Sequence, residues 1–128
     1  MKYLLDTHLL LWSVLDSAKL SAKARRVLSK DGAGYFFSAA SVWEIAIKRA
    51  KNPALLPFDS ATARNLFLAA GFLELAITSA HCIGVENLPA IHTDPFDRLL
   101  VAQAKADGCT LVTHDRLVAS YGDFTMMV

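Results

Sequence analysis

Short apolar runs alternate with longer amphipathic segments along the whole chain. The runs cover residues 3–5, 34–38, 72–78, 110–115 and 124–128, and two of them end in a polar cluster. Runs of this length, rich in aromatic and branched side chains, are typical of buried strands. Because strands that alternate with helices form right-handed crossovers, the pattern predicts an α/β sandwich with a mainly parallel sheet.

Seven segments between and after these runs have the composition of helices. They cover residues 9–15, 21–30, 38–51, 60–70, 79–87, 95–107 and 116–120. The segment 38–51 carries Trp43, Ala46, Ile47 and Ala50 on one side, and Glu44 is its only acid. An acid among apolar neighbours near a helix start is expected to be partly buried, and it then needs a cation or hydrogen-bond donors.

The segment HTDPFDRLLVAQA, residues 92–104, opens a helix with two carboxylates and is apolar afterwards. Asp94 and Asp97 are three residues apart, so both lie on one face of the first turn, and Pro95 suits the first helical position. A structural explanation exists, since Asp94 is a good N-cap and Asp97 takes the place of a capping-box acid. The acidic end must otherwise face a cleft or water.

Other acids occupy comparable positions. Asp6 follows the first predicted strand and Asp115 follows the fourth, and each can also cap the next helix. Glu44 can complete a capping box with Ser41 or pair with Lys48 one turn later. Strand ends and the helix starts that follow them face one edge of a parallel sheet, so these acids can converge with Asp97. A cluster of carboxylates favours Mg²⁺ or Mn²⁺, which offsets their repulsion.

The composition indicates one globular domain over residues 1–128 that has a partner. Apolar residues make up 54% of the chain and charged residues 20%, which excludes disorder and predicts apolar surface for an oligomer or complex. Cys82 and Cys109 form no CxxC motif, so we expect reduced, buried thiols. The N-terminus is interrupted by Asp6 and His8 and reads as a strand rather than a signal peptide; no run is long enough to span a membrane. The absence of a signal peptide and of a membrane-spanning run predicts a cytoplasmic protein.

The charges are unevenly distributed although the net charge is only +1. Residues 19–51 hold eight basic side chains and two acidic ones, whereas the chain beyond residue 51 holds eight acidic and four basic ones. Such a division suits a phosphate-bearing substrate that is led to an acidic, metal-holding site, although basic residues can also simply solvate helix faces.

Four motifs in this order resemble the PIN-domain nucleases, and most closely the VapC-like toxins of bacterial toxin–antitoxin systems. They are LLDTH with Asp6, SVWEIAIK with Glu44, DPFDRLLVAQA with Asp97 and LVTHD with Asp115. The resemblance covers essentially the whole chain. It implies a PIN-like five-stranded parallel sheet flanked by helices, Mg²⁺-dependent cleavage of RNA, a homodimer, and inhibition by a cognate antitoxin.

The resemblance implies an endoribonuclease in which four acids are both the metal ligands and the catalytic residues. They are Asp6, Glu44, Asp97 and Asp115. Further candidates are hydrogen-bond donors to these carboxylates, a residue that orients them or touches phosphate, and two histidines that are more often structural. They are Thr7, Ser38 and Thr113 as donors, Arg98 as the orienting residue, and His8 and His114 as the histidines.

Three other functions compete with a nuclease. A receiver-like phosphoacceptor domain has similar length and architecture, but it needs an acidic pair after the first strand and a late Lys, whereas Thr7 and His8 follow Asp6 here. In a haloacid-dehalogenase-like phosphatase a second Asp would stand where His8 stands. A catalytically silent RNA-binding or partner-binding relative is disfavoured by the presence of all four acids.

Overall fold

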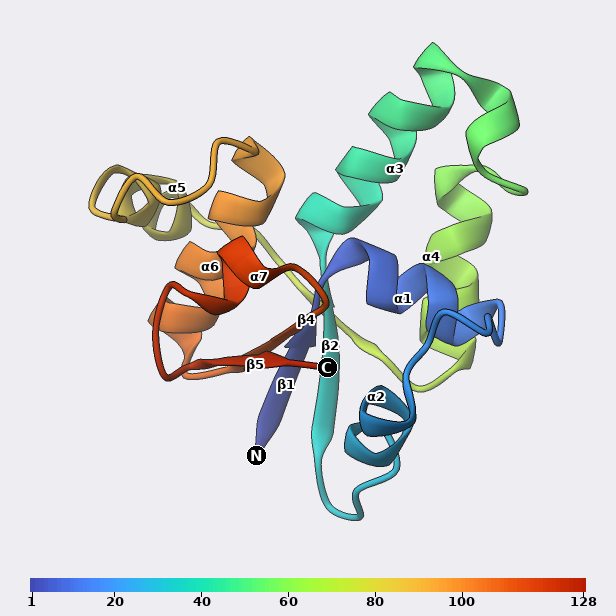
Figure 1. The fold of residues 1–128 in the computed structure, drawn as a ribbon. Coiled ribbons are helices and arrows are strands. Elements are labelled where there is room, and N and C mark those ends of the chain that lie inside the picture. Colours follow the sequence, from blue (N-terminus) through green and yellow to red (C-terminus); the bar gives the residue numbers. More distant parts are fainter.

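The computed structural model describes residues 1–128 and contains a single parallel sheet of five strands (Figure 1). The strands are β1 (Lys2–Leu5), β2 (Gly34–Ser38), β3 (Leu73–Leu75), β4 (Thr110–Thr113) and β5 (Thr125–Met127). Their order in the sheet is β3-β2-β1-β4-β5, and all four pairs are parallel. The predicted α/β class is therefore confirmed, with a sheet that is wholly parallel.

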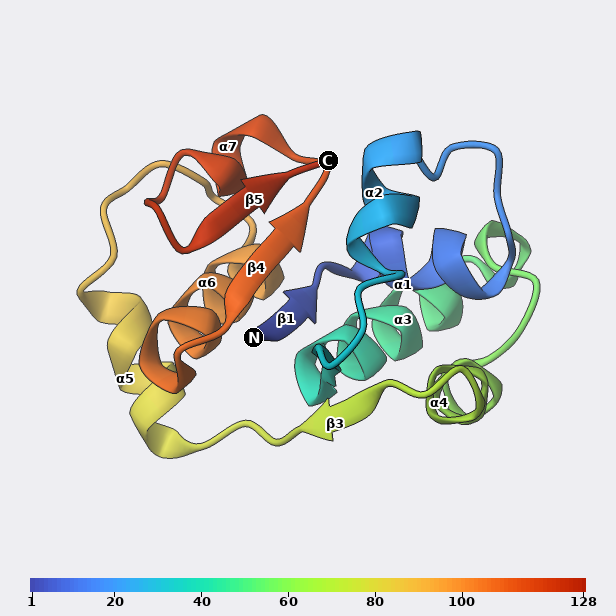
Figure 2. The same cartoon turned by 90° about the horizontal axis from the view of Figure 1, so that it is seen from below.

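Alternation along the strands creates two hydrophobic cores, one on each face of the sheet. Leu4 of β1 and Leu111 of β4, which are register partners, belong to one core, whereas Leu5 and Val112 belong to the other. Successive side chains of a strand point to opposite faces, so both faces must be covered by helices. The result is a three-layer sandwich, as the view along the sheet shows (Figure 2).

Seven helices cover the two faces. They are α1 (Thr7–Val14), α2 (Ala22–Val27), α3 (Ala39–Lys51), α4 (Ser60–Ala69), α5 (Ser79–Glu86), α6 (Pro95–Asp107) and α7 (Arg116–Ala119). The first core contains buried residues of α1 to α4, and the second contains those of α6 and α7 with Val85 of α5 against it. No helix combines the length and the hydropathy that a membrane span requires.

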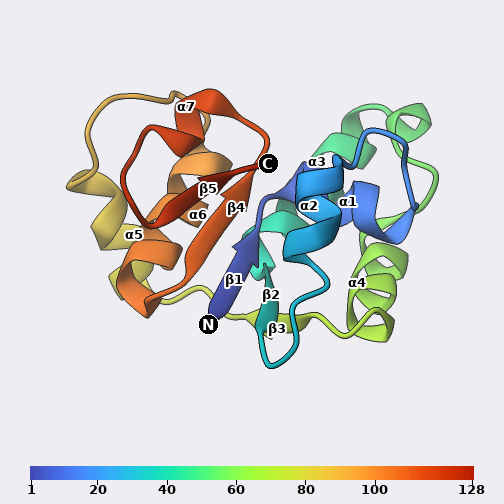
Figure 3. The same cartoon turned by 60° about the horizontal axis from the view of Figure 1, so that its bottom comes forward.

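The chain reverses its direction of travel across the sheet at β1. It proceeds from β1 through β2 to β3 on one side, and then returns to place β4 on the other side of β1 (Figure 3). Ligands of open α/β sheets bind beyond the carboxyl ends of the strands at such a switch point. Asp6 follows β1, and its backbone N–H bonds the Val112 carbonyl of β4 at 3.0 Å.

Three details differ from the sequence-based expectations. The third strand ends at Leu75 rather than residue 78, since the next carbonyl, of Ala76, accepts a hydrogen bond from Gln103 of α6. The side of α3 that carries Trp43 faces solvent, while Glu44 and Ile45 are buried. The prediction of two buried thiols is wrong for Cys82, which is exposed on α5. Cys109 is buried, and both cysteines are free.

Candidate metal centre

Asp6 connects the carboxyl ends of β1 and β4. It is 5% exposed and caps α1, with Oδ1 accepting from the Leu9 N–H at 2.9 Å. Its Oδ2 accepts from the Thr113 hydroxyl at 2.7 Å and from the His114 N–H at 3.2 Å. Burial raises the pKa of Asp6 even though these hydrogen bonds favour the carboxylate. The carboxyl group is thus both a cap and a buried acid, and Thr113 is the donor that the sequence predicted.

Glu44 is buried among donors rather than orphaned. It is 3% exposed, and its Oε1 accepts from the Thr7 hydroxyl at 2.7 Å. Its Oε2 lies 2.5 Å from the Lys48 Nζ, one helical turn later. The predicted burial, the pairing with Lys48 and the role of Thr7 as a donor are therefore present. The capping-box alternative is absent, because α3 begins earlier and Ser38 is its N-cap.

Asp97 lies in the first turn of α6, three residues after the N-cap. Asp94 is the N-cap, and its Oδ1 accepts from the Phe96 N–H at 2.8 Å and from the Asp97 N–H at 3.3 Å. Burial, followed by the negative charges of Asp94, Glu44 and Asp6, raises the pKa of Asp97 to about 7, although His92 acts in the opposite direction. Asp97 therefore lies within the electrostatic influence of two other predicted ligands.

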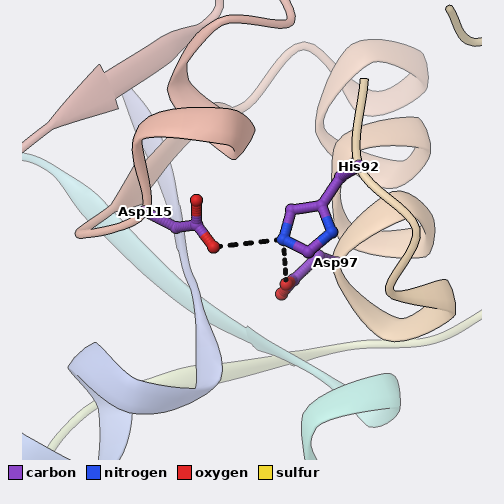
Figure 4. Close-up of side chains that lie close together, drawn as sticks. All are labelled: His92, Asp97 and Asp115. Carbon is purple, nitrogen blue, oxygen red and sulfur yellow. Dashed lines mark hydrogen bonds and ion pairs between the residues drawn. The ribbon is translucent and has the colours of Figure 1, made fainter. Parts of the chain in front are cut away.

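His92 brings Asp97 and Asp115 together (Figure 4). Its Nε2 lies 3.1 Å from Oδ2 of Asp115, to which it is hydrogen-bonded, and 3.2 Å from Oδ2 of Asp97. Nε2 of His92 and one carboxylate oxygen each of Asp97 and Asp115 lie within 4.8 Å of one another. Asp115 also caps α7, accepting from the Leu117 N–H at 2.8 Å. Burial alone would raise the pKa of Asp115, but these hydrogen bonds hold it below its ordinary value.

Hydrogen bonds determine which nitrogen of His92 carries the proton. Its Nδ1 accepts from the Asp94 N–H at 3.0 Å, so the neutral ring has its hydrogen on Nε2. Its backbone N–H donates to the Tyr121 hydroxyl at 2.9 Å, which holds the residue in place. In this arrangement His92 is a donor to the carboxylates rather than a ligand. We did not predict this residue, although its position just before an acidic helix start was a usable signal.

Two of the predicted supporting residues have other roles. Arg98 does not approach the carboxylates. Its guanidinium donates to the carbonyls of Val85 and Pro89 and to the Tyr121 hydroxyl. These hydrogen bonds join the connection before α6 to the rest of the fold. Ser38 bonds Gln103 of α6 and caps α3, and it contacts none of the four acids. The predicted contact with the carboxylates is therefore wrong for both residues, because tertiary partners compete for polar side chains that lie close to a site in the sequence, while a phosphate contact of Arg98 stays a prediction.

The acids lie around the switch point of the sheet. Asp6 and Asp115 line one hollow, Asp97 and Asp115 share His92, and the charges of Glu44 and Asp6 act on Asp97. A set of carboxylate oxygens under mutual repulsion fits a hard divalent cation, which relieves that repulsion and accepts oxygen ligands. The arrangement can hold such a cation and present it, through the hollow, to a phosphate.

Solved structures with a similar fold come from three bacteria. They are VapBC2 from Rickettsia felis bound to a DNA fragment from its promoter (TM-score 0.71, 14% identity, 100% of this chain and 98% of that chain covered), DNA-bound VapBC from Salmonella typhimurium (0.68, 15%, 100% and 97%) and VapBC-1 from nontypeable Haemophilus influenzae (0.59, 16%, 90% and 87%). A comparison with curated protein sequences gave no match. The family model described as PIN domain matches residues 3–123, almost the whole chain. The protein therefore belongs to the PIN domain family.

Proposed function

We propose that the protein is a metal-dependent endoribonuclease and the toxin of a toxin–antitoxin pair. The observation that carries the proposal is the acidic centre at the β1/β4 switch point, where burial and neighbouring carboxylates raise the pKa of Asp97 to about 7. Such repulsion between neighbouring carboxylates is expected where an enzyme holds a cation, because the cation relieves it. It is a cost without benefit where an acid serves only as a helix cap. Asp6, Glu44, Asp97 and Asp115 are the proposed ligands and catalytic residues.

The donor set suits Mg²⁺, with Mn²⁺ as a substitute. The four proposed ligands are carboxylates, and the one nearby imidazole has its Nε2 lone pair blocked by a hydrogen. A cation held there would activate water and neutralise charge on the phosphate during hydrolysis, in which water adds across a P–O bond. The proposed site needs no further protein ligand.

The chain's own residues would orient this reaction. Thr113 and the His114 N–H hold Asp6, while Thr7 and Lys48 hold Glu44, so these carboxylates keep one rotamer as a substrate enters. His92 holds Asp97 and Asp115 from the opposite side. Such preorganisation lowers the reorganisation cost at the moment when charge develops on the phosphate.

The proposed partners are RNA, a cognate antitoxin and a second copy of the chain. Three structures with this fold are VapBC complexes, and this supports an antitoxin partner here. An apolar hollow of about 410 Å³ beside α1 is available near the acidic centre, lined in part by Leu11, Leu15 and Leu55. Its apolar lining is in keeping with the apolar surface that the composition predicted for an oligomer or complex. Both cysteines are free, in keeping with the cytoplasm, where RNA and such a partner would be met.

The proposal is tested by incubating purified protein with total RNA in Mg²⁺, in Mn²⁺ and in chelator. We expect discrete fragments that require metal, and loss of at least a hundredfold in rate for Asp97→Asn, which keeps the shape of the side chain but removes its charge. Asp31→Asn is the matched control, since Asp31 is exposed in a turn and far along the chain from the four acids.

Two results would contradict the proposal. Wild-type cleavage by Asp97→Asn would remove Asp97 from the mechanism. Absence of cleavage in either metal, from folded protein free of antitoxin, would leave a binding function for this PIN domain.

A further inference from the structure

A second feature of the centre is an aromatic hollow that opens beside the carboxylates. It has a volume of about 360 Å³ and is lined by Asp6, His8, Trp12, His114 and Asp115. Its volume lies within the range of about 300–1,000 Å³ that small-molecule sites occupy. The lining comes from the residue after β1, from α1 and from the connection after β4, so this hollow and the proposed metal ligands lie at the carboxyl ends of the central strands.

The aromatic wall is built around Trp12. Its ring centroid lies 5.8 Å from that of His8, tilted by 37°, and 5.3 Å from that of His114, edge to face at 74°. Trp12 is half-buried and packs against the first hydrophobic core, whereas His8 is exposed. Packing against the core accounts for the position of Trp12 in the fold. It does not account for the two further rings, of His8 and His114, that lie against the Trp12 ring.

We propose that this hollow binds a nucleobase next to the phosphodiester that the centre would cleave. The inference rests on the proposed nuclease function. A base can stack on or pack edgewise against these rings, and such contacts are the usual way in which proteins hold single-stranded nucleic acid. A flat, partly anchored indole loses little conformational freedom on binding, because its neighbours already restrict it.

The polar groups of the hollow favour a base that carries an exocyclic amino group. His114 Nδ1 lies 2.9 Å from the Val128 carbonyl, which can only accept, so the neutral ring has its hydrogen on Nδ1 and Nε2 can only accept. Adenine, cytosine and guanine present an amino donor to such an acceptor, whereas uracil presents carbonyl oxygens on both sides of its single N–H. The hollow therefore selects a base with an amino group over uracil.

The base preference is tested with nucleosides, which carry no phosphate, in the presence of chelator. The indole N–H resonances of Trp12 and Trp43 are followed by NMR, with Trp43→Phe to assign them. We expect cytidine and adenosine to shift the Trp12 signal saturably and uridine to bind at least fivefold more weakly. Trp43 is the internal reference because it does not line the hollow.

A second experiment measures the affinity of a labelled cytosine-rich oligoribonucleotide by fluorescence anisotropy, again in chelator so that no cleavage occurs. Trp12→Leu should weaken binding between about fivefold and a hundredfold, the range of one base–aromatic contact. Trp12→Phe should restore most of the affinity, and Trp43→Leu should leave it unchanged. Thermal unfolding of each variant verifies that it is folded.

The results separate this inference from the proposed function. Nucleoside binding without RNA cleavage would reject the nuclease and keep the base site, whereas cleavage without any Trp12 shift would do the reverse. Equal binding of cytidine and uridine overturns the amino-group preference. An affinity unaffected by Trp12→Leu overturns the base site and leaves the hollow to a peptide of the partner protein.

Discussion

At the scale of single residues, the acids of the centre combine two roles. Asp6 and Asp115 cap helices through one oxygen and direct the other to the sheet edge, where Asp6 meets Thr113 and Asp115 meets His92. A serine or asparagine could cap equally well, but it could not supply a full negative charge. Capping and metal binding are therefore compatible, because a carboxylate has several acceptor sites.

His92 should stabilise the centre when no metal is bound. In His92→Ala the carboxylates of Asp97 and Asp115 lose the donor between them, so we expect the free energy of unfolding to fall by about 1.5–3 kcal/mol at pH 8 in chelator. Urea denaturation measures the change. Added Mg²⁺ should stabilise the variant more than the wild type. His8→Ala, which removes an exposed ring, is the control, and an equal loss there would argue against this role.

Asp97 should make the metal-free protein less stable as the pH rises. Its pKa is raised from the ordinary value of 3.8 to about 7 in the folded chain. The folded state therefore holds a proton that the unfolded state has released, and stability falls from about pH 4 until Asp97 is ionised above about pH 7. Asp97→Asn should remove this part of the dependence. Urea denaturation at several pH values in chelator measures it, and parallel profiles of the two proteins would contradict the assignment.

At the scale of elements, a buried hydrogen bond joins the two sides of the sheet. Gln103 of α6 is fully buried, bonds the Ser38 hydroxyl at the end of β2, and donates to the Ala76 carbonyl at 3.4 Å. This link positions the amino end of α3, and thus Glu44, relative to α6, and thus Asp97. The distance between two proposed ligands depends on a residue outside the centre.

Gln103→Leu should destabilise the fold by about 1–3 kcal/mol, because it leaves the buried Ser38 hydroxyl without its partner. Ser38→Ala in the same background should cost less than it does alone, with a coupling of about 0.5–3 kcal/mol in a double-mutant cycle. Chemical denaturation of the four proteins gives this value. Additive losses would show that the two residues act independently.

At the scale of the whole molecule, the apolar surface and the proposed assembly can be tested together. Trp43, Leu55, Leu73, Ile83 and Leu117 are each at least half exposed. We expect light scattering after size exclusion to give twice the chain mass of 13.9 kDa. A mass equal to that of one chain at micromolar concentration would reject the homodimer.

The sequence alone determined the α/β class, the parallel sheet, the caps at Asp6, Asp94 and Asp115, and the burial of Glu44. These features depend on periodicity and on contacts between residues near in the chain, which a sequence pattern records directly. It also singled out four acids, since their positions after strands and at helix starts are local properties.

Only the tertiary structure decided which polar side chains serve the centre. Residues 92–104 supply His92 and Asp97, which meet Asp115 of the connection after β4, while Arg98 and Ser38 bond partners elsewhere. The exposed side of α3 and the exposed Cys82 likewise depend on which helix covers which face. Hydrogen bonds and burial between distant segments follow from packing, and no periodicity in the chain encodes the partner that a given side chain will find.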